Sequence, residues 1–185
     1  MYQTQAAVLQ TSLAENGTGW HVFTFHYNPN ITNCISMGPR CEVSGPYNAK
    51  VANIHTPAGE TRFDTASGQT FATIQWSNLP VVEITGSVLP QYASQFLSLQ
   101  LAPDLTSSYR RMNVGGKSYN WTERGTAGTY LYKAGDFDST DPVARVRIVD
   151  SRTVVLEMKG EAFPAGLFQP CIAATVLLYS GRNFG

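Results

Sequence analysis

Residues 169–182 read QPCIAATVLLYSGR, and this stretch decides the fold of the 185-residue chain. Pro170 suits the first turn of a helix, and Gly181 suits the position just past its end. Between them almost nothing is polar on any face, so a helix here has to be enclosed by the rest of the protein. We therefore expect either a buried helix at 169–180 or, because Val176 is β-branched, one more buried strand.

Short alternations of apolar and polar residues, separated by Gly, Pro and Asn, fill the rest of the chain. Gly115-Gly116 predicts a tight turn between strands at 107–114 and 117–123. A second hairpin is expected from 142–150 and 152–159. Further strands are expected at Trp20–Tyr27, Asn48–His55, Glu60–Asp64, Phe71–Trp76, Val81–Gly86 and Thr129–Lys133. Turns spaced by about 8–12 residues are typical of a sandwich or barrel. No repeat or linker interrupts them, so residues 1–185 are expected to form a single domain.

Composition narrows the classes of function. Hydrophobic residues make up 43% of the chain and charged residues 14%, whereas about 25% is usual for charged residues in soluble domains. Thirteen basic residues balance thirteen acidic ones, and the basic ones are scattered. Without a net positive field or a basic run, nucleic-acid binding is not expected.

Localisation and redox state follow from the same reading. The first residues, MYQTQAAVLQTSLAENG, have no basic region and no continuous apolar core, so we expect no signal peptide and a cytoplasmic location. No stretch reaches the ~18–20 apolar residues of a membrane span. Cys34, Cys41 and Cys171 are expected to be reduced thiols. A bridge between Cys34 and Cys41 is the alternative in an oxidising compartment.

Neither a metal site nor a cofactor is expected. His21 and His26 are five residues apart on one strand, which puts them on opposite faces. The loop 135–141 carries three aspartates but lacks the glycine and the bidentate glutamate of a calcium loop. Nucleophile and phosphate-loop signatures are missing, so no catalytic residue is assigned.

Several short motifs occur in a recognisable order. They are Asn28-Pro29, Tyr47, the strand 72–76 (ATIQW), 95–97 (QFL), Arg111 with 116–121 (GKSYNW), Val143-Ala144, Leu156-Glu157 and the closing apolar segment. Together they resemble a family of domains of unknown function from mushroom-forming fungi, similar to LURP-one-related and tubby C-terminal proteins. The resemblance runs from Phe25 to the end and leaves residues 1–20 as an extension.

This resemblance implies a fold. It implies a closed antiparallel β-barrel of about twelve strands around a central helix at 169–180, which decides between helix and strand. Relatives usually carry several basic residues after the helix, whereas this chain has only Arg182.

The first functional hypothesis is a non-catalytic binding module for an anionic lipid or a protein partner. Its cationic residues would be Arg110, Arg111, Lys117 and Arg124, all near one hairpin. Neighbours in a strand point to opposite faces, so only one of Arg110 and Arg111 is expected to join a flat patch.

Two alternatives remain open. Tyr119 and Trp121 share one face of a strand, and Tyr130 and Tyr132 share one face of the next, so these aromatics suit a small-ligand or carbohydrate pocket. Cross-strand packing explains them equally well. The third hypothesis is an enzyme of isomerase or cyclase type that acts by positioning its substrate in an apolar cavity.

Overall fold

The computed structural model describes residues 19–27, 40–57, 59–102, 107–135 and 141–184. Thirteen strands form one antiparallel sheet. The strands are β1 Trp20–Tyr27, β2 Arg40–Ser44, β3 Lys50–His55, β4 Glu60–Thr65, β5 Thr70–Gln75, β6 Val81–Ile84, β7 Val88–Tyr92, β8 Ser98–Leu101, β9 Ser108–Val114, β10 Lys117–Glu123, β11 Thr129–Lys133, β12 Ala144–Asp150 and β13 Thr153–Lys159. The helices are α2 Ala93–Phe96 and α3 Phe168–Leu178.

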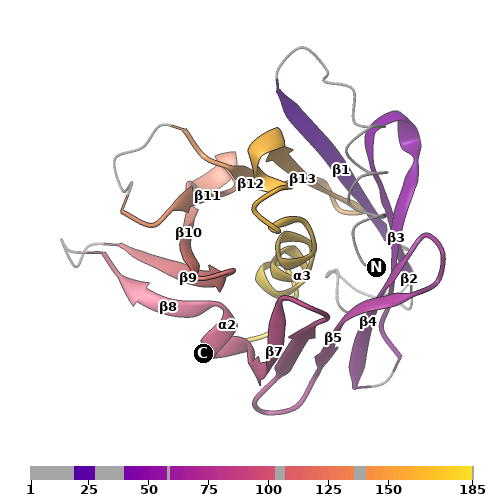
Figure 1. Cartoon of the computed structure of the whole chain (residues 1–185), viewed down its shortest axis with the longest axis horizontal. Helices are drawn as coiled ribbons and strands as arrows, with labels where there is room; N and C mark the ends of the chain where they lie inside the picture. The colour runs from indigo at the N-terminus through magenta and orange to yellow at the C-terminus, as the bar shows by residue number, and fades with distance from the viewer. Residues whose placement is uncertain (1–18, 28–39, 58, 103–106, 136–140, 185) are drawn as a thin grey trace.

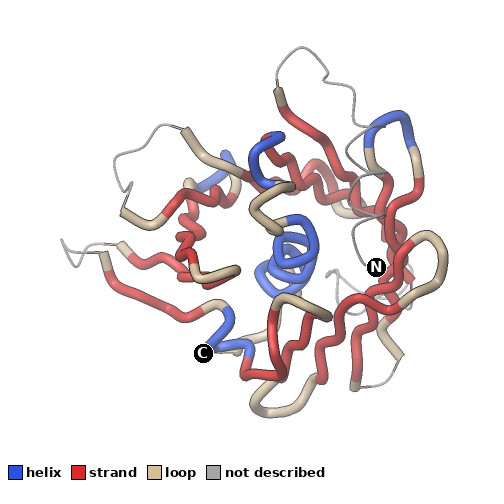
Figure 2. The backbone as a smooth tube through the Cα atoms, in the orientation of Figure 1, coloured by secondary structure: helices blue, strands red, loops and turns tan. Residues whose placement is uncertain are grey.

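The sheet curls around α3, which lies at the centre of the molecule (Figure 1). Its order is β7-β6-β5-β4-β3-β2-β1-β13-β12-β11-β10-β9-β8, so neighbours in the sheet are neighbours in sequence except for β1 and β13. Among the described residues, β7 and β8 are the two ends of this order and do not pair with each other. The short helix α2 connects them (Figure 2). The prediction of a mainly β fold with a C-terminal helix is confirmed, but the sheet is not closed by hydrogen bonds.

The central helix follows from its composition. Every residue from Pro170 to Leu177 is buried. The one polar side chain among them, Thr175, donates a hydrogen bond from Oγ1 to the Cys171 carbonyl at 2.7 Å. This bond satisfies a hydroxyl that would otherwise be costly to bury. Gly181, with φ +67°, provides the left-handed residue after the helix end.

The inner face of the sheet packs on this helix. Alternate residues of β1, such as Phe23 and Phe25, are fully buried there, as the period of two in a strand requires. Trp76 donates from Nε1 to Thr61 Oγ1 at 2.7 Å, so this buried indole is satisfied. After α3 the chain continues to Phe184, which is also buried.

Most predicted strands form at the predicted positions, including both hairpins. Ten strands were predicted by residue range; β2, β7 and β8 were missed, and with them the sheet has thirteen strands, compared with the about twelve that the resemblance implies. The central helix begins at Phe168 and ends at Leu178, close to the predicted 169–180.

His21 and His26 lie on opposite faces of β1, as predicted. His21 is buried against the Phe163 ring, and His26 is exposed.

Two cysteines are buried free thiols, Cys41 on β2 and Cys171 on α3. Cys34 lies outside the described residues. Burial, with a smaller effect of the Glu42 charge, raises the pKa of Cys41 to about 12. Burial also raises the pKa of Cys171. The thiolate is the reactive form of cysteine, and a raised pKa keeps both side chains protonated, so neither thiol is activated as a nucleophile.

We expect Cys41 and Cys171 of the folded protein to resist alkylation at pH 8. With a pKa of about 12, only about one Cys41 in ten thousand is a thiolate at that pH. The measurement is iodoacetamide labelling followed by peptide mass spectrometry, with the denatured protein as control. Labelling of Cys41 at the same rate in native and denatured protein would contradict this prediction.

Candidate functional site

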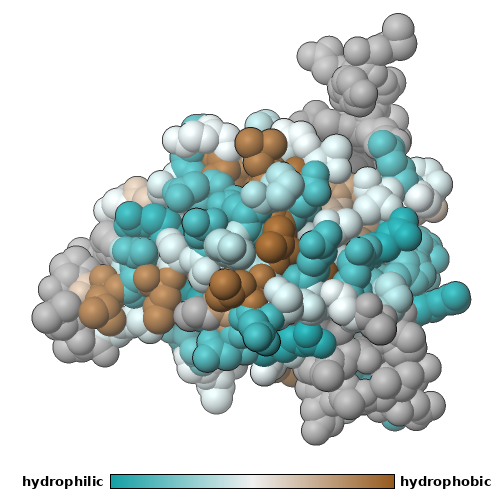
Figure 3. All heavy atoms as spheres, turned by 90° about the horizontal axis from the view of Figure 1, so that it is seen from below, coloured by the Kyte–Doolittle hydropathy of each residue, from teal (hydrophilic) through white to brown (hydrophobic). Residues whose placement is uncertain are grey.

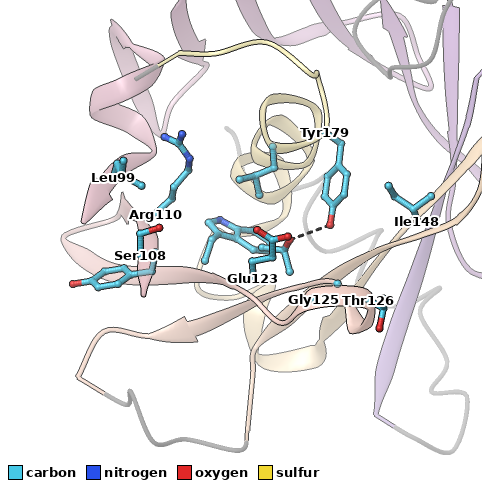
Figure 4. Close-up of a pocket in the computed structure, with 13 residues that line it drawn as sticks. Leu99, Ser108, Arg110, Glu123, Gly125, Thr126, Ile148 and Tyr179 are labelled. Carbon is cyan, nitrogen blue, oxygen red and sulfur yellow. Dashed lines mark hydrogen bonds between the residues drawn. The ribbon is translucent and has the colours of Figure 1, made fainter. Parts of the chain in front are cut away.

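A cleft of about 610 Å³ opens at the C-terminal end of α3. Residues from the five strands β8 to β12 and from the turn after β10 form its walls. Its lining residues are Leu99, Ser108, Tyr109, Arg110, Trp121, Glu123, Gly125, Thr126, Gly128, Thr129, Ile148, Leu178 and Tyr179. In Figure 4 Leu99 and Ile148 lie on opposite sides, with Arg110, Glu123 and Tyr179 between them. The volume of the cleft lies within the range of small-ligand sites, and its lining mixes polar and apolar side chains.

Two exposed apolar side chains, Leu99 and Ile148, lie at the rim of the cleft. Ile148 follows the buried Ala144 and Val146 on the inner face of β12, yet 61% of its surface is exposed. Leu99 on β8 is 52% exposed. Because α3 ends at Leu178, the inner face of the sheet beyond that point has no helix to cover it. These side chains remain in contact with water and provide apolar surface at the cleft mouth.

Arg110 is the cationic group inside the cleft. It lies on the same face of β9 as the buried Met112 and Val114. Its Nη1 donates to the Leu97 carbonyl at 3.0 Å, and its guanidinium lies 4.3 Å from the centre of the Phe184 ring. Burial lowers the pKa of Arg110 from its ordinary value. Arginine nevertheless stays charged at any relevant pH, so the cleft contains a fixed, half-buried cation.

Trp121 lies directly opposite Arg110 in the pairing of β9 with β10. Its side chain is 1% exposed, and its Nε1–H has no hydrogen-bond partner among the described residues. Buried indole N–H groups usually find a partner. The wall beside Arg110 therefore contains an unsatisfied donor. Glu123, two residues further along β10, is exposed to water.

A hydrogen-bonded hydroxyl pair holds the helix end in place. The Tyr179 hydroxyl lies 3.3 Å from the Val146 carbonyl, to which it donates, and 3.0 Å from Thr129 Oγ1. Because Tyr179 has one hydroxyl proton, Thr129 donates to Tyr179. Burial is the main cause of the raised pKa of Tyr179. The pair attaches α3 to β11 and β12 and keeps the floor of the cleft rigid.

The four predicted cationic residues do not form one patch. Arg110 points inward into the cleft. Arg111 points outward, where it donates to Tyr109 Oη at 3.0 Å and to Asn120 Oδ1 at 3.4 Å.

The guanidinium of Arg124 lies 5.6 Å from the centre of the Tyr132 ring, also on the outer face. Lys117 is at the hairpin end of β10, beside a second hollow lined by Tyr119 and Lys133. Strand alternation separates Arg110 from Arg111 as expected, and strand length separates Lys117 from both.

The aromatic residues are also divided between two faces. Trp121 pairs with Leu131, and Tyr119 pairs with Lys133, so both aromatics face inward. Tyr130 and Tyr132 face outward and stack on each other with their ring centres 6.4 Å apart. The four aromatic residues therefore do not share one face of the sheet. Of the four, Trp121 alone lines the cleft.

Sequence reasoning missed Leu97, Phe184 and Tyr179 as parts of this site. Tyr179 lines the cleft, and Leu97 and Phe184 contact Arg110; all three lie outside β9 and β10. Tyr179 had one available signal, a polar tip at the end of an otherwise apolar helix. Leu97 contributes its backbone carbonyl, which no residue type indicates.

Within the described ranges, no group of three or more histidine, cysteine, aspartate or glutamate side chains is arranged to hold a metal ion. The helices of the same ranges are all too short or too polar to cross a membrane. Comparison of the chain with family models, with curated proteins and with solved structures found no match.

Proposed function

We propose that this chain is a non-catalytic binding domain of the tubby-like kind, and that the cleft at the end of α3 binds the acidic group of an amphipathic ligand such as an anionic lipid. The curled sheet around an apolar helix supports the proposal that the chain is related to fungal tubby-like and LURP-one-like domains. In a closed barrel the two end strands, β7 and β8, would pair with each other, whereas here the short helix α2 connects them. We therefore place the binding surface in the cleft, and not on a flat patch formed by the four predicted cationic residues.

The observation that carries this proposal is the position of Arg110. A guanidinium presents several N–H groups in a planar fork that matches carboxylate and phosphate oxygens. Burying such a charge is costly, so contacts with the surrounding groups must stabilise a half-buried arginine. The Leu97 carbonyl and the Phe184 ring hold it in one orientation. A preorganised cation of this kind loses little freedom when an anion binds.

The rest of the cleft fits an amphipathic molecule. Leu99 and Ile148 provide exposed apolar surface at the mouth, where an acyl chain or similar group would contact them. Glu123 also lines the cleft, but water screens its charge because it is exposed. The half-buried Arg110 therefore dominates the interaction with an acidic group.

We expect weak binding to vesicles of phosphatidylcholine with phosphatidylserine, and less binding to phosphatidylcholine alone. Replacing Arg110 with Gln should weaken binding to the acidic vesicles about fivefold, from about 1 kcal/mol per basic residue at an anionic surface. The Lys117→Gln variant is the matched control, since it removes one charge at a distance from the cleft. Co-sedimentation measures all of these cases, and thermal melts verify that each variant is folded.

A short-chain phosphatidylserine below its micelle concentration separates a dissolved ligand from a membrane surface. Loss of the Arg110-dependent part of vesicle binding in the presence of this competitor supports occupancy of the cleft. Equal loss of binding in Arg110→Gln and Lys117→Gln would show that only diffuse charge matters and would remove the cleft from the proposal.

A further inference from the structure

Trp121 carries an unsatisfied hydrogen-bond donor in the wall of the cleft. Its side chain is buried, and its Nε1–H has no partner among the described residues. The buried indole of Trp76 has the usual arrangement, since it donates to Thr61 Oγ1 at 2.7 Å. A buried donor without an acceptor costs free energy. An acceptor that a ligand brings into the cleft would remove this cost.

Trp121 belongs to a row of residues that lie directly opposite one another across three strands. Leu99 on β8 pairs with Arg110 on β9, and Arg110 pairs with Trp121 on β10. Paired residues of an antiparallel sheet point to the same face, with their Cα atoms about 4.5–5.5 Å apart. All three residues line the cleft. Its wall therefore presents an apolar side chain, a cation and a neutral N–H donor in that order.

The charges in the cleft favour a ligand with one negative charge. Among the described residues that line it, Arg110 is the one cation and Glu123 the one anion. A phosphate monoester would bring a second negative charge that no cation of the cleft balances. A carboxylate has a single charge and two acceptor oxygens. It therefore matches one guanidinium and one neutral donor.

The depth of the donor favours the end of a molecule. Trp121 Nε1 lies beneath the accessible surface of the cleft, so a ligand reaches it only by inserting a terminal group between the side chains that cover it. The phosphate of a diacyl phospholipid is esterified on both sides and cannot enter end-first. The carboxylate of a single-chain acid is terminal and can enter in this way.

An apolar chain attached to this carboxylate would have surface to lie on. Leu99, beside Arg110, is 52% exposed, and Ile148 on the opposite side of the cleft is 61% exposed. Figure 3 views the side of the molecule where β8 lies, and it shows hydrophobic groups among the polar surface there. Contact with such groups removes apolar surface of both partners from water.

We propose that the cleft binds a single-chain amphipathic carboxylic acid, whose carboxylate accepts hydrogen bonds from Arg110 and from Trp121 Nε1–H and whose chain passes over Leu99. This inference rests on the proposed function, because it uses the same cleft and the same cation. It adds the chemical class of the ligand and a second residue that recognises its acid group.

Nuclear magnetic resonance of the indole N–H groups tests the contact with Trp121. The chain has three tryptophans, and single Trp→Phe variants assign their signals directly or by elimination. We expect decanoate below its micelle concentration to move the Trp121 signal downfield and to leave that of Trp76, already bonded to Thr61, in place. Decanol, which has the same chain without the acid, should move neither. Absence of decanoate binding, or a Trp121 signal that stays in place at saturation, would overturn the proposal.

Calorimetric titration measures what the donor contributes. Trp121→Phe removes the N–H but keeps an aromatic ring, and we expect it to weaken decanoate binding about tenfold or more, as for a lost hydrogen bond to a charged group. Tyr119→Phe is the matched control, since Tyr119 lies on the same face of β10 but lines the other hollow. Its variant should bind decanoate as the wild type does. Thermal melts verify that both variants are folded, and the wild-type spectrum tests the contact independently of them.

The outcomes separate this inference from the proposed function. Decanoate binding that is lost in Arg110→Gln but unchanged in Trp121→Phe would keep the acid-binding cleft and contradict the role of Trp121. Decanoate binding that is unchanged in Arg110→Gln would contradict both. Decyl phosphate, a terminal acid with more negative charge, should bind more weakly than decanoate. Tighter binding of decyl phosphate would overturn the choice of a carboxylate.

Discussion

Val176→Asp is expected to abolish folding. Val176 is completely buried in α3 at the centre of the molecule. A carboxylate there would have no partner, and burying an unpaired charge costs several kcal/mol or more. Domains of this size are stable by only about 5–15 kcal/mol in total. Circular dichroism and the yield of soluble protein measure the result.

The matched control is Val149→Asp, the same chemical change on β12. Val149 is 50% exposed, so water solvates the new carboxylate. We expect a change in unfolding free energy within about 0.5 kcal/mol, as for most surface substitutions. A folded, cooperatively melting Val176→Asp protein would mean that α3 is not enclosed by the sheet.

Gly128→Ala is the second large effect that we expect. Gly128 connects η3, the 3-10 turn Gly125–Ala127, to β11, with φ +108° and ψ −162°. Only glycine adopts this conformation readily. An added Cβ would lie 2.2 Å from the Val146 carbonyl oxygen, which belongs to the backbone of β12 and cannot rotate away. The turn or the strand must move, and we expect a loss of about 3–5 kcal/mol of unfolding free energy.

Gly116→Ala provides the comparison for Gly128→Ala. Gly116 also has a positive φ, +74°, but nothing lies within 4 Å of its added Cβ. It carries only the cost of the left-handed conformation, about 1–2 kcal/mol. Urea unfolding of both variants separates the two costs. Equal destabilisation would show that the close approach to Val146 is absent in solution.

Features set by local sequence could be predicted. The apolar run between Pro170 and Gly181 predicted a segment buried on every side, because no surface helix is apolar on all faces, and the family resemblance decided for a helix instead of a strand. Gly115 and Gly116 identified the β9–β10 hairpin because both have the positive φ of a primed turn. Strand β7 was missed because Pro90 interrupts its pattern, and β8 because four residues are too few for an alternation to stand out.

The faces of the aromatic residues could not be predicted. Whether Trp121 and Tyr130 share a face depends on the register between β10 and β11, and a slip of one residue reverses the answer. The pattern within each strand does not contain that register. The same limit applies to Arg110, whose role depends on Phe184 and on the Leu97 carbonyl, both from other parts of the fold.

The strand order has a consequence for how the chain folds. On either side of α2, strands β1–β7 and β8–β13 each form a meander built from contacts between near neighbours in sequence. Such local contacts form quickly. The pairing of β1 with β13 is different, because residues such as His26 and Thr153 are more than 120 positions apart. Closing so long a loop carries the largest entropic cost of any strand pair. We therefore expect the rate-limiting event of folding to be the joining of the two meanders around α3.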